Sequence, residues 1–220
     1  MSLLSEQITP IKRGKLQDSV YRKLCELILG GGIAPGQSVT VGSLADAFGV
    51  SPTPIREALM RLSAAGALTV VSGRTVGIPP LSRDRLDDLR RVRTEIESVA
   101  MRWACERTHP VFVKKLGLIL ERLRGTESTA NAKLYVHANY DFHFCIYRHA
   151  NSALLLTIIE NLWLQISPFF HLLRESGNFR ISNQHHVDIL RAIEAGSQND
   201  AVEALLLDIG DAYDILSKLI

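Results

Sequence analysis

The sequence predicts a mainly α-helical protein made of a small helical unit with a hairpin, followed by an all-helical bundle. Apolar residues make up 46% of its 220 residues and charged residues 22%, a globular composition that excludes global disorder. A segment rich in glycine and β-branched residues, 72–82, interrupts the helical pattern. Beyond it, apolar residues recur at helical spacing. We therefore divide the chain into domains 1–80 and 81–220.

Residues 1–80 contain signals for three helices, a short strand and a hairpin. Each helix ends at a glycine, and Pro-Gly and Ser-Gly turns separate other segments. The order of helix, strand, helix, tight turn, helix and two-stranded wing is typical of a winged helix-turn-helix. The predicted helices cover Leu16–Leu29, Ser43–Phe48 and Thr53–Ala65, and the predicted strands cover Ser38–Thr40, Ala67–Val71 and Thr75–Ile78.

Residues 81–220 contain about six helical segments and no other regular pattern. Pro79 and Pro80 prevent a helix from crossing the boundary, and Ser82 is a suitable N-cap for the long helix that follows. Proline, glycine or asparagine marks each later break. The sequence thus predicts an all-helical bundle, whose later helices cover 110–124, 130–149, 152–176, 182–195 and 198–219.

The cysteines and the apolar stretches indicate a soluble, cytoplasmic protein without a membrane partner. The longest nearly apolar stretch, Ala153–Ile159, is too short to span a bilayer, and the first residues lack a signal-peptide core. Three widely spaced cysteines do not suit a disulfide framework or a cysteine zinc site, and they indicate a reducing compartment. These cysteines are Cys25, Cys105 and Cys145.

Charged and imidazole side chains are unevenly distributed along the chain. Residues 1–80 hold eight Lys/Arg and five Asp/Glu, a mildly basic balance that permits nucleic-acid binding. All seven histidines lie at or after His109. The second part is therefore the place to look for a site that needs imidazoles.

The start of the third predicted helix carries residues suited to double-stranded DNA. Ser51 and Thr53 bring hydroxyls to a helix N-terminus, where free backbone N–H groups suit a phosphate. Arg56, one turn further, could reach a guanine edge or a phosphate. Gly73 and Arg74 form the predicted tip of the wing, from which an arginine could enter the minor groove. The alternative is that Arg56 belongs to an ordinary solvated helix face.

A longer motif surrounds these residues. The run LADAFGVSPTPIREALMRLSAAGAL, preceded by GGIAPGQ, resembles the DNA-binding domain of GntR-family transcription regulators. The second part resembles the FCD ligand-binding domain of the FadR subfamily, and together the two resemblances extend from about Leu16 onward. They imply a homodimer on a palindromic operator, most often a repressor that a small organic acid releases.

Two positions depart from the pattern of these regulators. Pro52 stands where arginine is frequent, and Gly42 stands where some members carry a basic residue. The operator of this chain therefore cannot be copied from relatives. Three cations ahead of the first helix either compensate through phosphate contacts or form a disordered basic lead: Lys12, Arg13 and Lys15.

The first predicted helix of the bundle carries a candidate effector-binding residue. The run Arg93-Thr94-Glu95-Ile96-Glu97 resembles the R-x-x-L-E pattern of FCD domains. This resemblance implies that Arg93 faces the bundle cavity and pairs with a carboxylate of the effector, a task for which a planar guanidinium is well suited. The alternative is an exposed Arg93 that pairs with Glu97 one turn away.

Four residues form a candidate site for a divalent metal ion such as zinc, nickel or manganese. Asn139 and His143 share a helix face, and their segment resembles the D-x-x-[FH]-H metal region of FCD domains, with asparagine in place of aspartate. The remaining ligands implied by the resemblance fall on His186 and on Asp208, where histidine is usual. Two imidazoles, a carboxylate and an amide suit such an ion, with water completing the shell. Alternatively, the two histidines contact an effector directly.

Three further hypotheses compete with this one. His137 and Asp141 also have i, i+4 spacing, but on another face of the helix. A metal-dependent hydrolase would need a base such as Asp141, yet the chain has no nucleophile motif, phosphate loop or H-E-x-x-H pattern, and we expect no enzyme. The third hypothesis is a regulator with a degenerate pocket, whose helical domain serves only for dimerisation.

Overall fold

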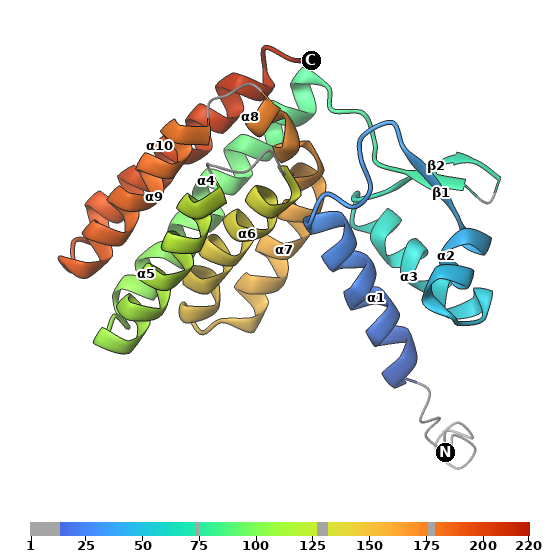
Figure 1. Ribbon diagram of the computed structural model, residues 1–220, viewed down its shortest axis with the longest axis horizontal. Coiled ribbons are helices and arrows are strands. Elements are labelled where there is room, and N and C mark those ends of the chain that lie inside the picture. Colours follow the sequence, from blue (N-terminus) through green and yellow to red (C-terminus); the bar gives the residue numbers. More distant parts are fainter. Residues whose placement is uncertain (1–13, 74, 127–131, 176–178) are drawn as a thin grey trace, which may run out of the picture.

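The computed structural model describes residues 14–73, 75–126, 132–175 and 179–220. It confirms the predicted fold class, because a winged helix-turn-helix precedes an all-helical bundle. Helix α1 lies between the rest of the winged unit and the bundle (Figure 1). The winged unit consists of α1 (Gly14–Leu29), β1 (Ser38–Thr40), α2 (Val41–Phe48), α3 (Pro52–Ala64), β2 (Thr69–Ser72) and β3 (Thr75–Gly77).

The three strands form one antiparallel sheet in the order β1-β3-β2. Val76 of β3 lies opposite Val39 of β1 on one side and Val70 of β2 on the other. The pairing of β2 with β3 is irregular between Val70 and Ser72, next to the turn at the tip. This sheet carries the wing beside α3.

Local signals account for the turn between α2 and α3. Thr40 and Ser43 form a capping box at the start of α2, in which the Thr40 side chain accepts a hydrogen bond from the Ser43 backbone N–H at 3.0 Å. Gly49 ends α2 with a φ of 64°, a left-handed conformation that glycine adopts without strain. Helix α3 then begins with Pro52 in its first turn, where a missing N–H costs nothing.

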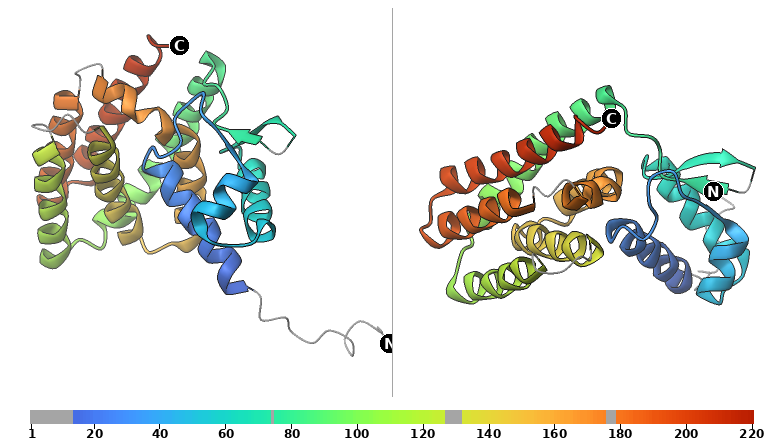
Figure 2. Two further views of the ribbon diagram at one scale, coloured as in Figure 1. Left: turned by 45° about the vertical axis from the view of Figure 1, so that its right-hand side comes forward. Right: turned by 45° about the horizontal axis from the view of Figure 1, so that its top comes forward.

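The bundle is arranged around α4. This helix packs against α10, α6 and α7, while α9 lies against α10 and α5. Figure 2 shows the long helices running alongside one another. The helices are α4 (Arg83–Cys105), α5 (Pro110–Gly125), α6 (Ala132–His149), α7 (Ala153–Ile166), α8 (Phe170–Glu175), α9 (Phe179–Glu194) and α10 (Gln198–Leu216), with the 3₁₀ turn η2 (Ser167–Phe169) between α7 and α8.

The helix predicted over residues 152–176 is divided in the structure. Helix α7 ends at Ile166, and η2 leads into the short α8. Pro168 lies in η2, and a proline lacks the N–H that a continuous α-helix would need there. The described part of the bundle therefore contains one more helix than the pattern predicts.

The same region contains a segment with the length and composition of a membrane span. Residues 153–173, which include the stretch Ala153–Ile159, are long and apolar enough to cross a bilayer by length and composition. Half of the apolar window is buried within the protein, and Trp163, Leu164 and Ile166 belong to the core. Burial of this kind is typical of a core helix.

Candidate DNA interface and buried polar site

The N-terminal end of α3 presents the residues predicted to meet DNA. Ser51 is the N-cap of α3, but its side chain makes no capping hydrogen bond, so its hydroxyl is available. Thr53 and Arg56 are exposed on the first turns, while Ile55 on the same helix is fully buried. Burial of one face therefore fixes the side of α3 that is presented to solvent.

The wing lies beside this face. A groove of about 300 Å³ runs between α3 and the wing, and both Arg56 and Gly73 line it. Gly73 has a φ of 48°, which suits the tight turn at the tip. Arg74, the predicted minor-groove residue, lies outside the described residues, as do Lys12, Arg13 and the side chain of Lys15.

A group of buried polar side chains lies inside the bundle. His143 of α6, His186 of α9 and Asp208 of α10 are at most 7% exposed. The Nε2 atom of His143 lies 3.0 Å from Nε2 of His186 and 3.3 Å from Oδ2 of Asp208. Nε2 of His186 lies 3.9 Å from Oδ1 of Asp208. The structure thus brings three of the four predicted metal ligands into one group.

Asn139, the fourth predicted ligand, lies one turn before His143 on α6. It is 6% exposed, so its amide also belongs to the interior of the bundle. Residues at i and i+4 share a helix face, which directs Asn139 and His143 to the same side of α6. Asn139 thus shares the buried side of α6 with His143.

A second polar group adjoins the first. Arg93 of α4 is buried, and its Nε lies 2.6 Å from Oε1 of Glu97, which is fully buried. The hydroxyl of Tyr147 donates a short hydrogen bond to the other oxygen of Glu97. Burial acts to lower the pKa of Arg93, but the Glu97 carboxylate outweighs it and raises that pKa. Arg93 thus lies inside as the resemblance implies, yet pairs with Glu97 as the alternative predicts.

Tyr147 connects the two groups. Burial, together with the neighbouring Glu97 carboxylate, raises the pKa of Tyr147 well above its usual value. The hydroxyl therefore keeps its proton and donates a hydrogen bond to Glu97. Its oxygen lies 3.3 Å from Nδ1 of His143 and can accept a hydrogen bond from an Nδ1–H. The tautomer with its proton on Nδ1 would leave Nε2 of His143, the atom nearest to His186 and Asp208, with a lone pair for a metal ion.

The donor set fits a divalent metal ion. Two ligand atoms bound to one zinc ion at about 2.0–2.2 Å lie roughly 3.3 Å apart in a tetrahedral site. The separations of 3.0, 3.3 and 3.9 Å lie around this value, and all three ligand atoms fall within 4.8 Å of one another. Two neutral imidazoles and one carboxylate are ligands that zinc, nickel and manganese accept.

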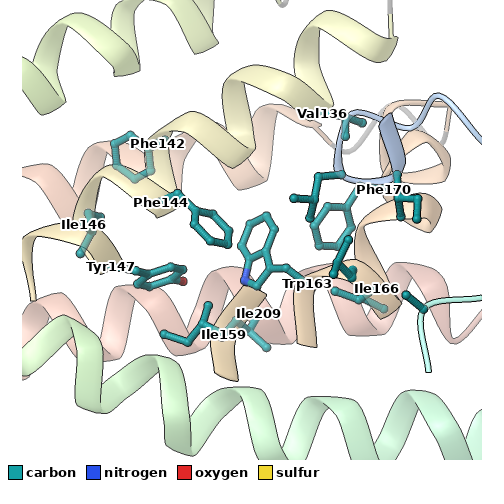
Figure 3. Close-up of a cluster of buried hydrophobic side chains, with 14 of the residues drawn as sticks. Val136, Phe142, Phe144, Ile146, Tyr147, Ile159, Trp163, Ile166, Phe170 and Ile209 are labelled. Atoms are coloured by element: carbon teal, nitrogen blue, oxygen red, sulfur yellow. The ribbon is translucent and has the colours of Figure 1, made fainter. Parts of the chain in front are cut away.

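Trp163 lies beside both polar groups and has an unused donor. The indole is at the centre of the buried cluster in Figure 3, with its nitrogen directed toward Tyr147. Its Nε1 has no hydrogen-bond partner among the described residues, although the side chain is only 1% exposed. The ring lies 5.2 Å from that of His143, and Arg93 Cζ lies 5.3 Å from the ring centre. An acceptor atom entering here would remove the cost of an unsatisfied buried donor.

The space next to Arg93 is small in this conformation. A cavity of about 10 Å³ lies between α4 and α10, lined by Arg93, Phe170 and Ile209 among others. This is about the smallest volume that holds one water molecule. Entry of a larger molecule at this point would require α4 and α10 to move apart.

The alternative pair, His137 and Asp141, is on the surface of α6. The two side chains are 67% and 31% exposed and lie 4.0 Å apart, and Asp141 also lies 3.9 Å from Arg122. The candidate base of a hydrolase thus pairs with other surface charges. Sequence reasoning missed the role of Tyr147, although its i, i+4 spacing from His143 was the available signal.

Comparison with known proteins agrees with this arrangement. The family model for the FCD domain matches residues 88–210, and the model for bacterial regulatory proteins of the gntR family matches residues 16–78. This chain belongs to the GntR family of transcription regulators and carries an FCD domain. The family confirms the expected DNA-binding regulator, rather than an enzyme.

Several relatives of this GntR-family regulator are known. The HTH-type transcriptional regulator McbR of Escherichia coli is 32% identical over 148 residues, which cover 67% of each chain. The Nta operon transcriptional regulator of Aminobacter aminovorans is 26% identical over 84% of this chain and 87% of its own. A solved structure of E. coli McbR covers 93% of this chain and 98% of its own, with 27% identity and a TM-score of 0.86.

Proposed function

We propose that this regulator is a cytoplasmic repressor that binds a palindromic operator as a homodimer and releases it when a small carboxylate enters the helical domain. A divalent metal ion held by His143, His186 and Asp208, with Asn139 as a further ligand, takes part in binding that carboxylate. The winged domain is residues 1–80 and the effector and dimerisation domain is residues 81–220. The observation that carries the proposal is the convergence of three ligand atoms from α6, α9 and α10 within 4.8 Å.

Operator recognition rests on Ser51, Thr53 and Arg56 at the exposed start of α3 and on Gly73 and Arg74 at the wing. The test is recovery of genomic DNA fragments by the purified protein at near-physiological salt, because protein–DNA affinity depends strongly on salt. The wild type should enrich a shared palindrome, whereas Arg56→Ala should not. Arg91→Ala, an exposed arginine on α4, is the matched control. Failure of the wild type to enrich any sequence, with or without small carboxylates, would overturn the proposal.

Metal binding rests on the two imidazoles and the carboxylate. Titration calorimetry with zinc, nickel and manganese salts should give one site per chain. His186→Ala should weaken binding at least about tenfold, since it removes a direct ligand. His185→Ala is the matched control, because His185 is the next residue on α9 but contacts Asp211 at 2.7 Å instead. Equal affinities for the two variants would contradict a site at His186.

Carboxylate binding rests on the donors next to the metal ligands. Trp163 lies beside His143, and Arg93 lies over the Trp163 ring, so that the guanidinium and the indole N–H can each donate to a carboxylate oxygen. Because the cavity beside Arg93 is only about 10 Å³, a carboxylate must bind to a conformation in which this cavity is larger. Such a difference in affinity between two conformations is what shifts an equilibrium. Small carboxylates should therefore raise Tm in the presence of zinc, by mass action.

Dimerisation rests on an apolar stripe along the outer side of α4. Val92 and Trp103 are each 39% exposed, and Ile96 and Val99 between them are partly exposed. Their spacing of four, three and four residues is that of a seam between two helices. A second copy of the same helix would cover this stripe in a two-fold symmetric contact.

The degenerate-pocket hypothesis has one observation in its favour. Arg93 is already neutralised by Glu97 at 2.6 Å, so its charge is satisfied without an effector. If neither metal ions nor carboxylates raise Tm, the helical domain serves only for dimerisation.

A further inference from the structure

An arginine of the bundle, itself bonded to a second bundle side chain, binds the chain just beyond the C-terminal end of the recognition helix α3. Nη2 of Arg85, in the first turns of α4, donates to the carbonyl oxygen of Gly66 at 2.7 Å. The same nitrogen donates to Oε1 of Gln165 on α7 at 3.1 Å. One carbonyl just beyond α3 is thus bound by α4, and the donor is shared with α7.

The backbone conformation of Gly66 and the limited space around it suit the contact with Arg85. Gly66 has a φ of 71°, so it reverses the chain directly after α3. A Cβ at this position would lie 3.2 Å from Oε1 of Gln165, which leaves little room for a side chain. The carbonyl of Gly66 accepts a charge-assisted hydrogen bond from a half-buried guanidinium, and burial lowers the pKa of that Arg85 group.

The two helices that supply these side chains also meet at the buried polar site. Arg93 lies eight residues after Arg85 on α4, roughly 12 Å along the helix. Trp163 lies two residues before Gln165 on α7. Arg93 Cζ is 5.3 Å from the centre of the Trp163 ring, and the Trp163 ring is 5.2 Å from that of His143. A change at the polar site therefore acts on α4 and α7 at the point where they touch each other.

We propose that Arg85 and Gln165 are positioning residues that hold the recognition helix in the orientation set by the buried site. Arg85 bonds to both Gly66 and Gln165 only while α4 and α7 keep their present register. A ligand that shifts one helix against the other breaks this double contact and frees the end of α3. The regulatory half of the proposal, that a ligand frees the end of α3, rests on the proposed function. Its structural half, that Arg85 and Gln165 hold the end of α3, does not.

Hydrogen exchange tests the structural half without DNA or ligand. The amides of residues 65–68 all bond back to α3, so their exchange reports how firmly its end is held. Arg85→Ala and Gln165→Ala should each speed exchange there roughly five- to tenfold, since each removes a hydrogen bond of the contact. Arg91→Ala should leave it unchanged, and Arg85→Lys should restore part of the protection. Wild-type exchange rates in Arg85→Ala would overturn the proposal.

Operator binding with and without Zn²⁺ tests the regulatory half. In the wild type the two operator Kd values should differ, and in Arg85→Ala their ratio should fall to within about twofold of one. Zinc affinity, set by His143, His186 and Asp208, should not fall, because Arg85 is not a ligand of the ion and coupling is reciprocal. A variant that keeps the wild-type ratio would overturn the coupling role. If wild-type operator binding ignores Zn²⁺, the ion by itself does not shift the helices, and the exchange experiment alone decides the positioning role.

Discussion

Arg93 and Glu97 illustrate at the scale of single residues how a buried charge is kept in a helical core. The pair is almost completely removed from water, and Tyr147 supplies Glu97 with a second donor. Removal of one partner from such a pair is far more costly than removal of both, because it leaves an uncompensated charge.

Arg93→Leu should therefore lower the free energy of unfolding by about 3–5 kcal/mol, since Glu97 would stay buried without its cation. The double variant Arg93→Leu, Glu97→Leu should lose less, because no isolated charge remains. Urea denaturation of both variants measures the difference. A double variant as unstable as the single one would contradict this account of the pair.

Glu160 on α7 offers a test by pH. Burial raises the pKa of its carboxyl, an effect that the nearby Arg148 partly opposes. Because the folded state binds the proton more tightly than the unfolded state, the ionised carboxylate lowers stability at neutral pH. Glu160→Gln should raise Tm at pH 7 by less than about 4 °C, since the group is only half-buried. The gain should disappear as the pH falls below about 4.3, the unfolded value.

Thermal unfolding of Glu160→Gln at pH 7 and pH 4 checks this. Glu121→Gln, at an exposed position of α5, is the matched control. A gain for Glu160→Gln that is as large at pH 4 as at pH 7 would show that burial of the charge is not its cause.

At the scale of elements, the two helices of the helix-turn-helix begin in different ways. Thr40 makes a capping hydrogen bond to the backbone of α2, whereas Ser51 makes none at the start of α3. A hydroxyl that is not used to stabilise its own helix remains available to a phosphate. The Thr40 hydroxyl therefore stabilises its own helix, whereas the Ser51 hydroxyl is available for DNA.

Thr40→Ala should lower the free energy of unfolding by about 0.5–2 kcal/mol through loss of the cap. Ser51→Ala should cost less stability but should weaken operator binding. Denaturation and fluorescence anisotropy on the same two proteins check both parts. An equal loss of stability in the two variants would mean that the Ser51 hydroxyl also caps its helix.

At the scale of the whole molecule, α4 carries three groups of residues on which the proposals depend. Its inner side carries Arg93 and Glu97, its first turns hold Gly66 through Arg85, and its outer side carries the apolar stripe from Val92 to Trp103. A helix with this position can connect the proposed dimer contact and the proposed ligand site to the recognition helix without any long chain of side chains.

The double variant Val92→Glu, Trp103→Glu should shift the protein from dimer to monomer, because it places charges in the seam between two copies. Operator affinity should fall with it, since a palindrome is bound by both halves of a dimer. Val111→Glu is the matched control, because Val111 is 73% exposed and belongs to α5 rather than to the stripe on α4. Sedimentation velocity checks the oligomeric state, and a dimeric double variant would exclude this interface.

Much of the fold could be predicted from short-range signals in the sequence. These signals are glycine and proline positions, helix caps and helical periodicity, and each depends on neighbours within one or two turns. They therefore suffice to predict the winged unit and the bundle. The same holds for the N-terminal end of α3, where Ser51, Thr53 and Arg56 lie within two turns. The break of α7 at Pro168 escaped the prediction, although proline was a signal for it.

Only the tertiary structure decided how distant residues meet. His143, His186 and Asp208 come from three helices, and helix packing alone sets their separations of 3.0–3.9 Å. The sequence offered an exposed and a buried position for Arg93, and packing of α4 against α7 made it buried and paired. Arg85 bonds to Gly66, 19 positions before it, and to Gln165, 80 positions after it. Local patterns determined the elements and the family of this protein, because they depend on near neighbours. The polar site and its link to the recognition helix depend on side-chain packing, which no local pattern specifies.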